Sequence, residues 1–196
     1  MHLLVVSALA LATLVTPQGD PPPPGRVTID IVTVAGTGCR AGSSSVSVQP
    51  DNSRFTLDHG EVIGWVGGAA KPADARKICR AQLRITPPQG YTYALAPTTY
   101  RGWVHLEPGA TATVRFTHTF QGEMPHESTH HFSGPDDDYW ERADPEGPGL
   151  PCGQAKLVTI VTDVRVSLGS ADPKRNSYLA TDAFSTEHRF TWTRCP

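Results

Sequence analysis

Apolar and polar residues alternate along most of this chain, and no segment keeps a helical period over three turns. The clearest alternation lies at residues 111–120, which predicts a strand with Ala112, Val114, Phe116, His118 and Phe120 on one face. Threonines fill most of the opposite face, a pattern typical of an antiparallel sheet with one solvated side. A second long strand is predicted at residues 158–168, where apolar residues recur at every second position.

Shorter alternating runs predict the remaining strands, at residues 27–31, 45–48, 55–57, 82–85, 91–95, 100–106, 129–132, 178–180 and 188–193. Residues 134–153, rich in Asp, Pro and Gly, are expected to be irregular, and residues 70–81 have room for a helical turn or two. About eight to ten strands separated by frequent turns predict an all-β fold, an antiparallel β-sandwich of two sheets.

The N-terminal region is predicted to direct export. Residues 3–15 carry no charge, are too short for a bilayer, which needs about 20 residues, and fit the apolar core of a signal peptide. We assign residues 1–19 to the signal peptide, although a cut after Ala12 also fits the small-residue rule. Residues 20–25 are expected to form an extended Pro-rich spacer, and residues 26–196 the β-sandwich domain.

No second long apolar run and no hydrophobic C-terminal tail are visible, so no membrane anchor is expected and the protein is predicted to be secreted and extracellular. A chain of 196 residues with Lys+Arg 17 against Asp+Glu 19 is the size of one domain and has no basic excess. We therefore expect no nucleic-acid partner, and we expect a monomer.

The four cysteines, Cys39, Cys79, Cys152 and Cys195, indicate two disulfides in an exported chain. No pair has the C-x-x-C spacing of a zinc ribbon or a thioredoxin. Four cysteines allow three connectivities. We favour Cys39–Cys79 and Cys152–Cys195, because each bridge then closes a loop within one half of the chain.

An acidic and aromatic cluster, Asp136, Asp137, Asp138, Tyr139 and Trp140, is the candidate ligand-binding site. Oxygen-rich loops can bind Ca²⁺, but the spacing of an EF-hand is absent. Aromatic rings beside carboxylates can also stack on a sugar while the carboxylates bind its hydroxyl groups. A solvated acidic loop with one aromatic side chain in the core is the third interpretation, and the three remain open.

Four of the eight histidines are metal-ligand candidates: His118, His126, His130 and His131. A strand would place His126 and His130 on one face and His131 on the other. No H-E-x-x-H motif is present, and solvated surface histidines are the alternative interpretation. The sequence predicts no cofactor.

No catalytic residue is predicted, since the chain has neither a G-x-S-x-G motif nor a cysteine left for a Cys–His pair. A carboxylate pair for glycoside hydrolysis would be assembled in space, and Asp58, Glu61, Asp163 and Asp182 are candidates only in that sense.

Eight short motifs are spread along nearly the whole mature chain: Val27–Asp30, Gly36–Cys39, Arg76–Cys79, Pro88–Tyr91, Tyr100–Trp103, Phe132–Asp136, Pro151–Gly153 and Trp192–Cys195. In order and spacing they resemble an uncharacterised secreted family catalogued as domain of unknown function 4360. The resemblance implies export, two disulfides and an all-β domain, and it supplies no catalytic residues.

Three classes of function remain open. We favour a secreted non-catalytic protein that binds a cell-wall or other extracellular glycan, because no catalytic motif accompanies the aromatic cluster. The alternatives are a secreted hydrolase with a carboxylate pair assembled in space, and a secreted effector or inhibitor that acts on another protein. The partner is therefore expected to be an extracellular polysaccharide or a protein.

Overall fold

The computed structural model describes residues 19–39, 42, 44–153, 155–182 and 186–196. The predicted signal peptide, apart from Gly19, lies outside these described residues. Within them the chain is all-β, with thirteen strands and one short 3-10 helix. The strands are β1 (Thr28–Ala35), β2 (Ser45–Val48), β3 (Arg54–Asp58), β4 (Ile63–Val66), β5 (Arg76–Thr86), β6 (Tyr91–Leu95), β7 (Thr99–Leu106), β8 (Thr111–Phe120), β9 (His126–Ser133), β10 (Asp136–Ala143), β11 (Lys156–Ser167), β12 (Ser177–Thr181) and β13 (Thr186–Arg194).

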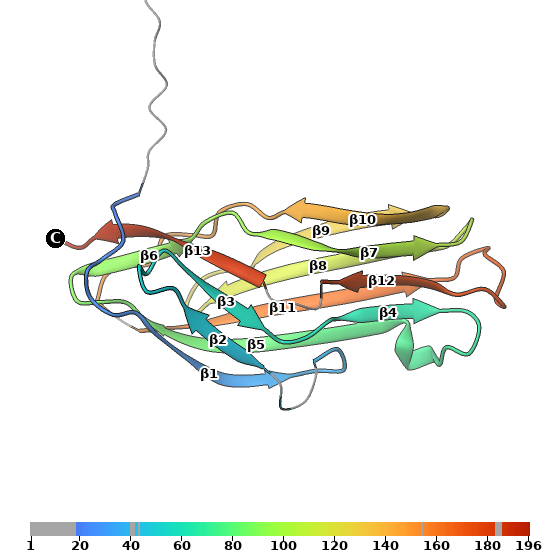
Figure 1. Ribbon diagram of the computed structural model, residues 1–196, viewed down its shortest axis with the longest axis horizontal. Helices are drawn as coiled ribbons and strands as arrows, with labels where there is room; N and C mark the ends of the chain where they lie inside the picture. Colours follow the sequence, from blue (N-terminus) through green and yellow to red (C-terminus); the bar gives the residue numbers. More distant parts are fainter. Residues whose placement is uncertain (1–18, 40–41, 43, 154, 183–185) are drawn as a thin grey trace, which may run out of the picture.

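One layer of the molecule is a long five-stranded sheet in the order β1-β5-β11-β8-β9. Its three central strands are 10 to 12 residues long and run the length of the molecule (Figure 1). All of its strand pairs are antiparallel. The predicted inner face of β8 is confirmed, because Ala112, Val114, Phe116, His118 and Phe120 are all buried.

The second layer consists of two four-stranded sheets that lie end to end over the long sheet (Figure 1). Their orders are β10-β7-β12-β4 and β2-β3-β13-β6. The chain passes from one to the other three times, through the links after β3, β6 and β12. The prediction of two sheets is therefore wrong in number. The second layer is divided at these links. The strand count also exceeds the expected eight to ten, and β4 and β10 are the strands that no predicted run covers.

The core is divided in the same way as the second layer. One cluster lies between the long sheet and β10-β7-β12-β4 and includes Val104, Phe116, Trp140 and Leu179. The other lies under β2-β3-β13-β6 and contains a group of rings in which Phe190 contacts Phe55, Tyr93 and Trp192. Each fully buried large apolar side chain stabilises the fold by roughly 1.5–3 kcal/mol.

The expectation that residues 134–153 are irregular is wrong for Asp136–Ala143, which form strand β10. This strand pairs with β7 over its whole length, from Asp136 opposite Leu106 to Ala143 opposite Thr99. Aspartate is disfavoured in strands, so local propensity does not predict β10. As an edge strand, β10 places only Trp140 in the core, and its polar residues are tolerated because most of them face solvent.

The helical turn allowed at residues 70–81 is reduced to the 3-10 helix Pro72–Asp74. The Asp74 carboxylate accepts hydrogen bonds from the Lys71 amide and from Lys77 Nζ, each at 2.9 Å. The chain then enters β5 at Arg76, because that strand pairs on both sides with long neighbours.

The Pro-rich segment 20–25 contacts the domain directly. The Asp20 amide donates to the Trp192 carbonyl oxygen at 2.9 Å, and Asn52 Nδ2 donates to the Pro23 carbonyl oxygen at 2.9 Å and to that of Gly25. Asn52 has a positive φ of 56°, a left-handed conformation that asparagine tolerates better than most residues. Its side chain holds the segment against the end of β13.

The favoured disulfide connectivity is confirmed. Cys39–Cys79 joins the turn after β1 to the middle of β5, and Cys152–Cys195 joins the connection before β11 to the last residues of the chain. The bridges span sequence separations of 40 and 43 residues. In the chain-entropy description, a loop of this length stabilises the fold by about 4 kcal/mol.

Candidate ligand-binding face

The solvent side of sheet β10-β7-β12-β4 carries four aromatic side chains, which we call the aromatic face: Trp65, Trp103, Tyr139 and Tyr178. Tyr139 on β10 lies directly opposite Trp103 on β7. Tyr178 on β12 lies opposite Trp65 on β4 and, on its other side, opposite His105 on β7. Residues directly opposite each other in an antiparallel sheet share a face, so the aromatic groups lie on one surface.

Trp103 and Tyr139 form the most exposed part of this surface, with exposed fractions of 43% and 47%. Aromatic side chains of this size normally bury most of their area, either in a core or against a partner. A contiguous exposed patch of this type usually marks a binding site, whereas single exposed apolar residues need no explanation. The pairing of two such rings therefore makes this sheet surface the best candidate site.

Polar groups surround the rings. Asp137 Oδ1 accepts a hydrogen bond from Trp103 Nε1 at 3.2 Å and lies 3.2 Å from His105 Nδ1. The His105 ring stacks on Tyr178, with 5.5 Å between ring centroids. These contacts fix the orientation of the indole and the imidazole.

A charged pair flanks the other side of the rings. Arg101 Nε donates to Glu141 Oε2 at 2.7 Å across β7 and β10. Desolvation and the nearby Asp182 raise the pKa of Tyr139, so its hydroxyl group stays neutral and can donate a hydrogen bond at ordinary pH. The aromatic face therefore offers apolar rings together with hydrogen-bond donors and acceptors at its edges.

The predicted acidic and aromatic cluster is divided by the alternation of β10. Asp137 and Tyr139 point to the aromatic face, whereas Asp136 and Asp138 belong to the opposite side of the strand. Trp140 is only 3% exposed, and its Nε1 donates to the Ala180 carbonyl oxygen at 3.2 Å. The prediction that Trp140 binds a ligand is therefore wrong, because Trp140 is a core residue. The aromatic residues that join Tyr139 on the surface are Trp65, Trp103 and Tyr178.

Three of the four candidate histidines face the inner side of the long sheet, and His131 points from the outer side. His118 is buried directly opposite His126, and His126 and His130 share the inner side of β9 as predicted. No group of three metal-binding side chains exists among the described residues. His130 Nε2 instead lies 3.5 Å from Asp144 Oδ1, which also accepts a hydrogen bond from Ser128.

His118 belongs to a buried polar group at the break in the second layer, by which we mean the place where the two four-stranded sheets meet. Its Nε2 lies 2.9 Å from Tyr100 Oη, and its ring meets that of His188 edge-on at 5.7 Å. Burial lowers the pKa of His118, and it lowers that of the fully buried His188 well below the ordinary value. Burial also raises the pKa of Tyr100 well above its ordinary value. These groups are therefore neutral at pH 7.

The four carboxylates considered for hydrolysis lie in different surroundings. Asp163 is bound by arginines on the outer face of the long sheet, and Glu61 is exposed. Asp58 accepts the Gly60 amide at 3.0 Å. Asp182 lines a cavity of about 90 Å³ at the break, with His59, Tyr100 and Glu187 among its other walls.

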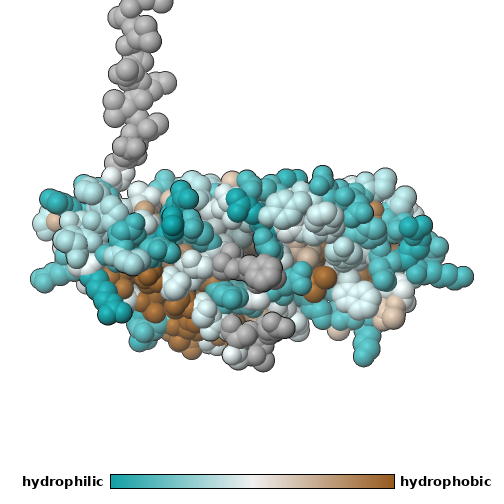
Figure 2. Space-filling model, viewed as in Figure 1, coloured by the Kyte–Doolittle hydropathy of each residue, from teal (hydrophilic) through white to brown (hydrophobic). Residues whose placement is uncertain are grey.

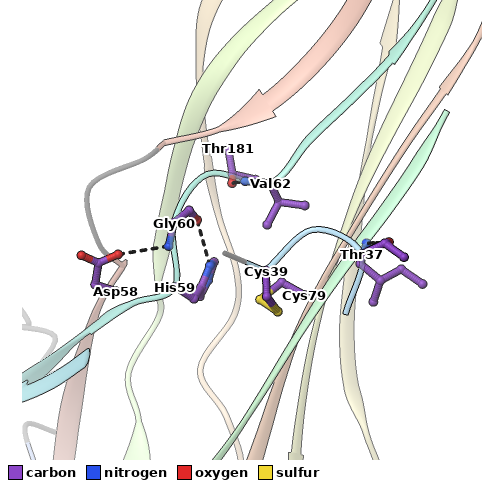
Figure 3. The surroundings of a disulfide bond; sticks show 9 residues. Thr37, Cys39, Asp58, His59, Gly60, Val62, Cys79 and Thr181 are labelled. Carbon is purple, nitrogen blue, oxygen red and sulfur yellow. Dashed lines mark hydrogen bonds between the residues drawn. A yellow bond between two sulfur atoms is a disulfide. The ribbon is translucent and has the colours of Figure 1, made fainter. Parts of the chain in front are cut away.

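Figure 3 shows how the break is organised around the Cys39–Cys79 disulfide. The Asp58–Val62 link carries the chain from β3 to β4 here, with His59 Nδ1 3.0 Å from the Gly60 carbonyl oxygen. The Val62 amide donates to Thr181 Oγ1 at 3.1 Å. Burial lowers the pKa of His59 as well, so its ring is neutral at pH 7.

A hydrophobic area appears in Figure 2 over the region of β1 and β2. It coincides with a hollow of about 620 Å³ between these two edge strands, whose lining includes Ile29, Val46 and Val48. Polar residues, among them Arg26, Asp30 and Gln49, share the lining with these apolar side chains, and no residue of the sequence-predicted site belongs to it.

The fold and the site define the class of protein: a disulfide-linked all-β domain with an aromatic surface on one sheet. The chain belongs to the family described as "Domain of unknown function (DUF4360)", which matches residues 25–195. It is also similar to an "Uncharacterized secreted protein" of Arthroderma benhamiae, with 27% identity over 186 residues, covering 90% of this chain and 75% of the relative.

Among solved structures, HutD from Pseudomonas fluorescens SBW25 aligns over 87% of this chain and 100% of its own, at 8% identity. The TM-score is 0.15, which is too low to support any argument from that fold. In the described part of the chain, no helix combines the length and the apolar character needed to cross a bilayer.

Proposed function

We propose that this protein is a secreted, non-catalytic protein that binds an extracellular glycan through the aromatic face. The observation that carries the proposal is the exposed cross-strand pair of Trp103 and Tyr139. Sugar rings have C–H groups on their faces and hydroxyl groups on their edges. The rings of the aromatic face can stack on the C–H groups, and Asp137 and Glu141 can accept hydrogen bonds from the hydroxyl groups.

Export is supported by three separate observations. The relative from Arthroderma benhamiae is described as secreted, the chain contains two disulfides, and residues 1–19 have the pattern of a signal peptide. Disulfides persist mainly in oxidising compartments such as the extracellular space. A glycan of the cell wall or of the surroundings is the ligand that such a protein would encounter.

The shape of the site favours a polymer over a small sugar. Trp65, Trp103, Tyr139 and Tyr178 lie on a sheet surface, and they come from all four of its strands. Small-molecule sites are usually concave and enclose most of their ligand. A surface several strands wide instead contacts successive sugar units of a long or insoluble chain.

Retention on insoluble polysaccharides tests the proposal. The purified protein is incubated with cellulose, chitin and insoluble β-glucan, and the bound fraction is measured. We expect retention on at least one polymer. Trp103→Ala and Tyr139→Ala should each weaken it about tenfold, equivalent to about 1.4 kcal/mol.

Met124→Ala is the matched control, because Met124 has the largest exposed fraction, 80%, of the exposed large apolar side chains among the described residues and lies outside the aromatic face. It should leave retention unchanged. Lack of retention on every polymer, or equal retention of the Trp103→Ala variant, would reject the glycan proposal. The secreted effector or inhibitor would then become the leading alternative, since exposed aromatic groups also suit protein partners.

A further inference from the structure

The outer face of the five-stranded sheet differs in chemistry from the aromatic face. The strand registers place five arginines there, Arg76, Arg80, Arg84, Arg115 and Arg165, against three carboxylates, Asp30, Asp163 and Glu127. Threonines of β8 and β11 fill many of the positions between them. This face is therefore locally basic although the whole chain has a net charge of -2.

Three of these arginines converge on one carboxylate. Arg76 donates from Nε and Nη2 to the two oxygens of Asp163 at 3.0 and 2.9 Å. Arg115 and Arg165 each donate from Nη2 to Asp163 Oδ2 at 3.2 Å. We call these four residues the arginine cluster. The Asp163 side chain is 3% exposed, whereas the three arginine side chains are 41% to 50% exposed.

The arginine cluster contains more positive charge than the buried carboxylate needs. Burial acts to raise the pKa of Asp163, but hydrogen bonds from Arg76 and Arg165 outweigh it and keep the pKa below its ordinary value. Three guanidinium groups surround a single negative charge, so the four residues together carry an excess of positive charge. Glu127 lies 3.9 Å from Arg115, so part of the excess on that side is balanced.

The register of β5 and β11 makes the excess positive charge of the arginine cluster unfavourable for stability. Arg165 lies directly opposite Arg76 on β5, and like charges in such cross-strand positions are destabilising. On its other side Arg165 lies opposite Thr113 on β8. A local arrangement that opposes stability is most often found where a surface has a binding role.

A depression lies beside the arginine cluster. It has a volume of about 350 Å³ and is lined by two arginines, three hydroxyl-bearing residues and three small apolar residues: Arg76, Arg165, Thr111, Thr113, Ser167, Ala75, Ala112 and Val166. Each guanidinium has five N–H donors in a fixed plane, and the contacts with Asp163 use at most two of them. The remaining donors and the hydroxyl groups suit an anionic oxygen group.

We propose that the arginine cluster and this depression bind the anionic groups of an acidic polysaccharide, carboxylate or sulfate. Guanidinium groups recognise both through paired, charge-assisted hydrogen bonds. The buried Asp163 holds the three side chains in place, which reduces the conformational entropy lost on binding. This site lies on the opposite outer face of the molecule from the aromatic face and does not depend on the function proposed above.

Acidic polysaccharide is favoured over nucleic acid for two reasons. The register of the five-stranded sheet places no Trp, Tyr or Phe on its outer face, so the described strands offer no ring on which bases could stack. The net charge of -2 also gives no broad positive field for a phosphate backbone.

Binding to polymers of defined charge tests this inference. Affinity of the full protein is measured for polygalacturonate, dextran sulfate and uncharged dextran, at low and high salt. We expect binding to at least one acidic polymer, no binding to dextran, and weakening by salt. Phospholipid vesicles that contain phosphatidylserine and duplex DNA are included as other sources of anionic groups.

Thr113→Glu is the decisive variant, because it places a carboxylate opposite Arg165 without removing any partner of Asp163. It should weaken binding of the acidic polymer roughly tenfold or more, while the melting temperature stays near that of the wild type. Arg165→Gln should act in the same direction. Arg189→Gln, on β13 and 65% exposed, is the control and should leave binding unchanged.

Three outcomes of these binding measurements would overturn the inference. Absence of binding to both acidic polymers at low salt, or equal binding by the folded Thr113→Glu variant, overturns the inference. Tighter binding to the vesicles or to DNA than to either polysaccharide also overturns it. Trp103→Ala should leave acidic-polymer binding unchanged, so failure of this site and failure of the aromatic face can be distinguished.

Discussion

Tyr100 and His118 face each other across the core, with 2.9 Å between the phenol oxygen and the imidazole Nε2, at the level where the second layer is divided. Tyr100 comes from β7 and His118 from β8, so the contact joins the two layers. His188 completes the group, with its Nδ1 3.4 Å from Thr98 Oγ1. Neutral polar side chains thus occupy the place where continuous apolar packing is interrupted.

This buried group predicts that acid destabilises the protein. In the folded state the pKa values of His118 and His188 lie below the ordinary value of 6.5. The unfolded chain therefore binds more protons below about pH 6.5, and the stability contributed by the neutral rings is lost as the pH falls further. Denaturant unfolding between pH 7.5 and 5 should show a falling free energy of unfolding.

The variant His188→Gln separates this effect from other titrations, because glutamine cannot gain a proton. Its free energy of unfolding should fall less steeply over the same range, even if it is lower at pH 7. The pKa of Asp163 is depressed below 3.8, so its contribution is lost only at more acidic pH. Identical slopes for the variant and the wild type would show that His188 is not responsible.

Gly102→Ala should destabilise the sheet that carries the aromatic face. A Cβ at Gly102 would meet the Ala180 carbonyl oxygen and the Trp140 ring. We expect a loss of about 2–3 kcal/mol, the range of overpacked cores, measured by denaturant unfolding. Gly149→Ala is the control, since a Cβ there meets nothing within 4 Å, and it should be close to neutral.

Asn52 should be important for stability because it combines a left-handed backbone with buried hydrogen bonds. Asn52→Ala loses both, and we expect a loss of about 2–3 kcal/mol. Asn52→Gly retains the backbone conformation and loses only the side-chain contacts, so it should lose about 1 kcal/mol less. Thermal or denaturant unfolding gives the comparison, and equal losses would exclude a backbone contribution.

Removal of either disulfide should lower stability by about 2–5 kcal/mol, because the unfolded chain gains freedom. The paired variants Cys39→Ser/Cys79→Ser and Cys152→Ser/Cys195→Ser test this one bridge at a time. Thiol titration of the native protein should find no free sulfhydryl group. One or more reactive thiols in unreduced, denatured protein would contradict the assigned pairing.

The sequence predicts one strand of the aromatic face, β7, but does not predict its partner β10. Alternation at residues 100–106 places Trp103 on the solvent side of a strand, and it places Val104 in the core. Nothing local indicates that residues 136–143 are a strand, because three consecutive aspartates suppress the signal. The pairing of β10 with β7 is what sets Tyr139 beside Trp103 and Trp140 in the core.

The arginine cluster was likewise predictable from the sequence only for the residues that lie on one strand. The sequence places Asp163 and Arg165 two residues apart, and therefore on one face of a strand. Arg76 is 87 residues from Asp163, and Arg115 is 48 residues away. No local pattern relates these residues, and only the registers of β5, β11 and β8 bring them together.

The sequence by itself determined the all-β class, the buried face of each long strand, the two disulfides and the family. The class, the buried faces and the disulfides follow from side-chain alternation and cysteine content, and the family follows from the resemblance of short motifs. All of these are local properties of the chain. The tertiary structure alone decided that the second layer is divided, that β10 exists, and which aromatic and basic side chains are neighbours. Those properties depend on strand order and register, which are set by contacts between residues far apart in the chain.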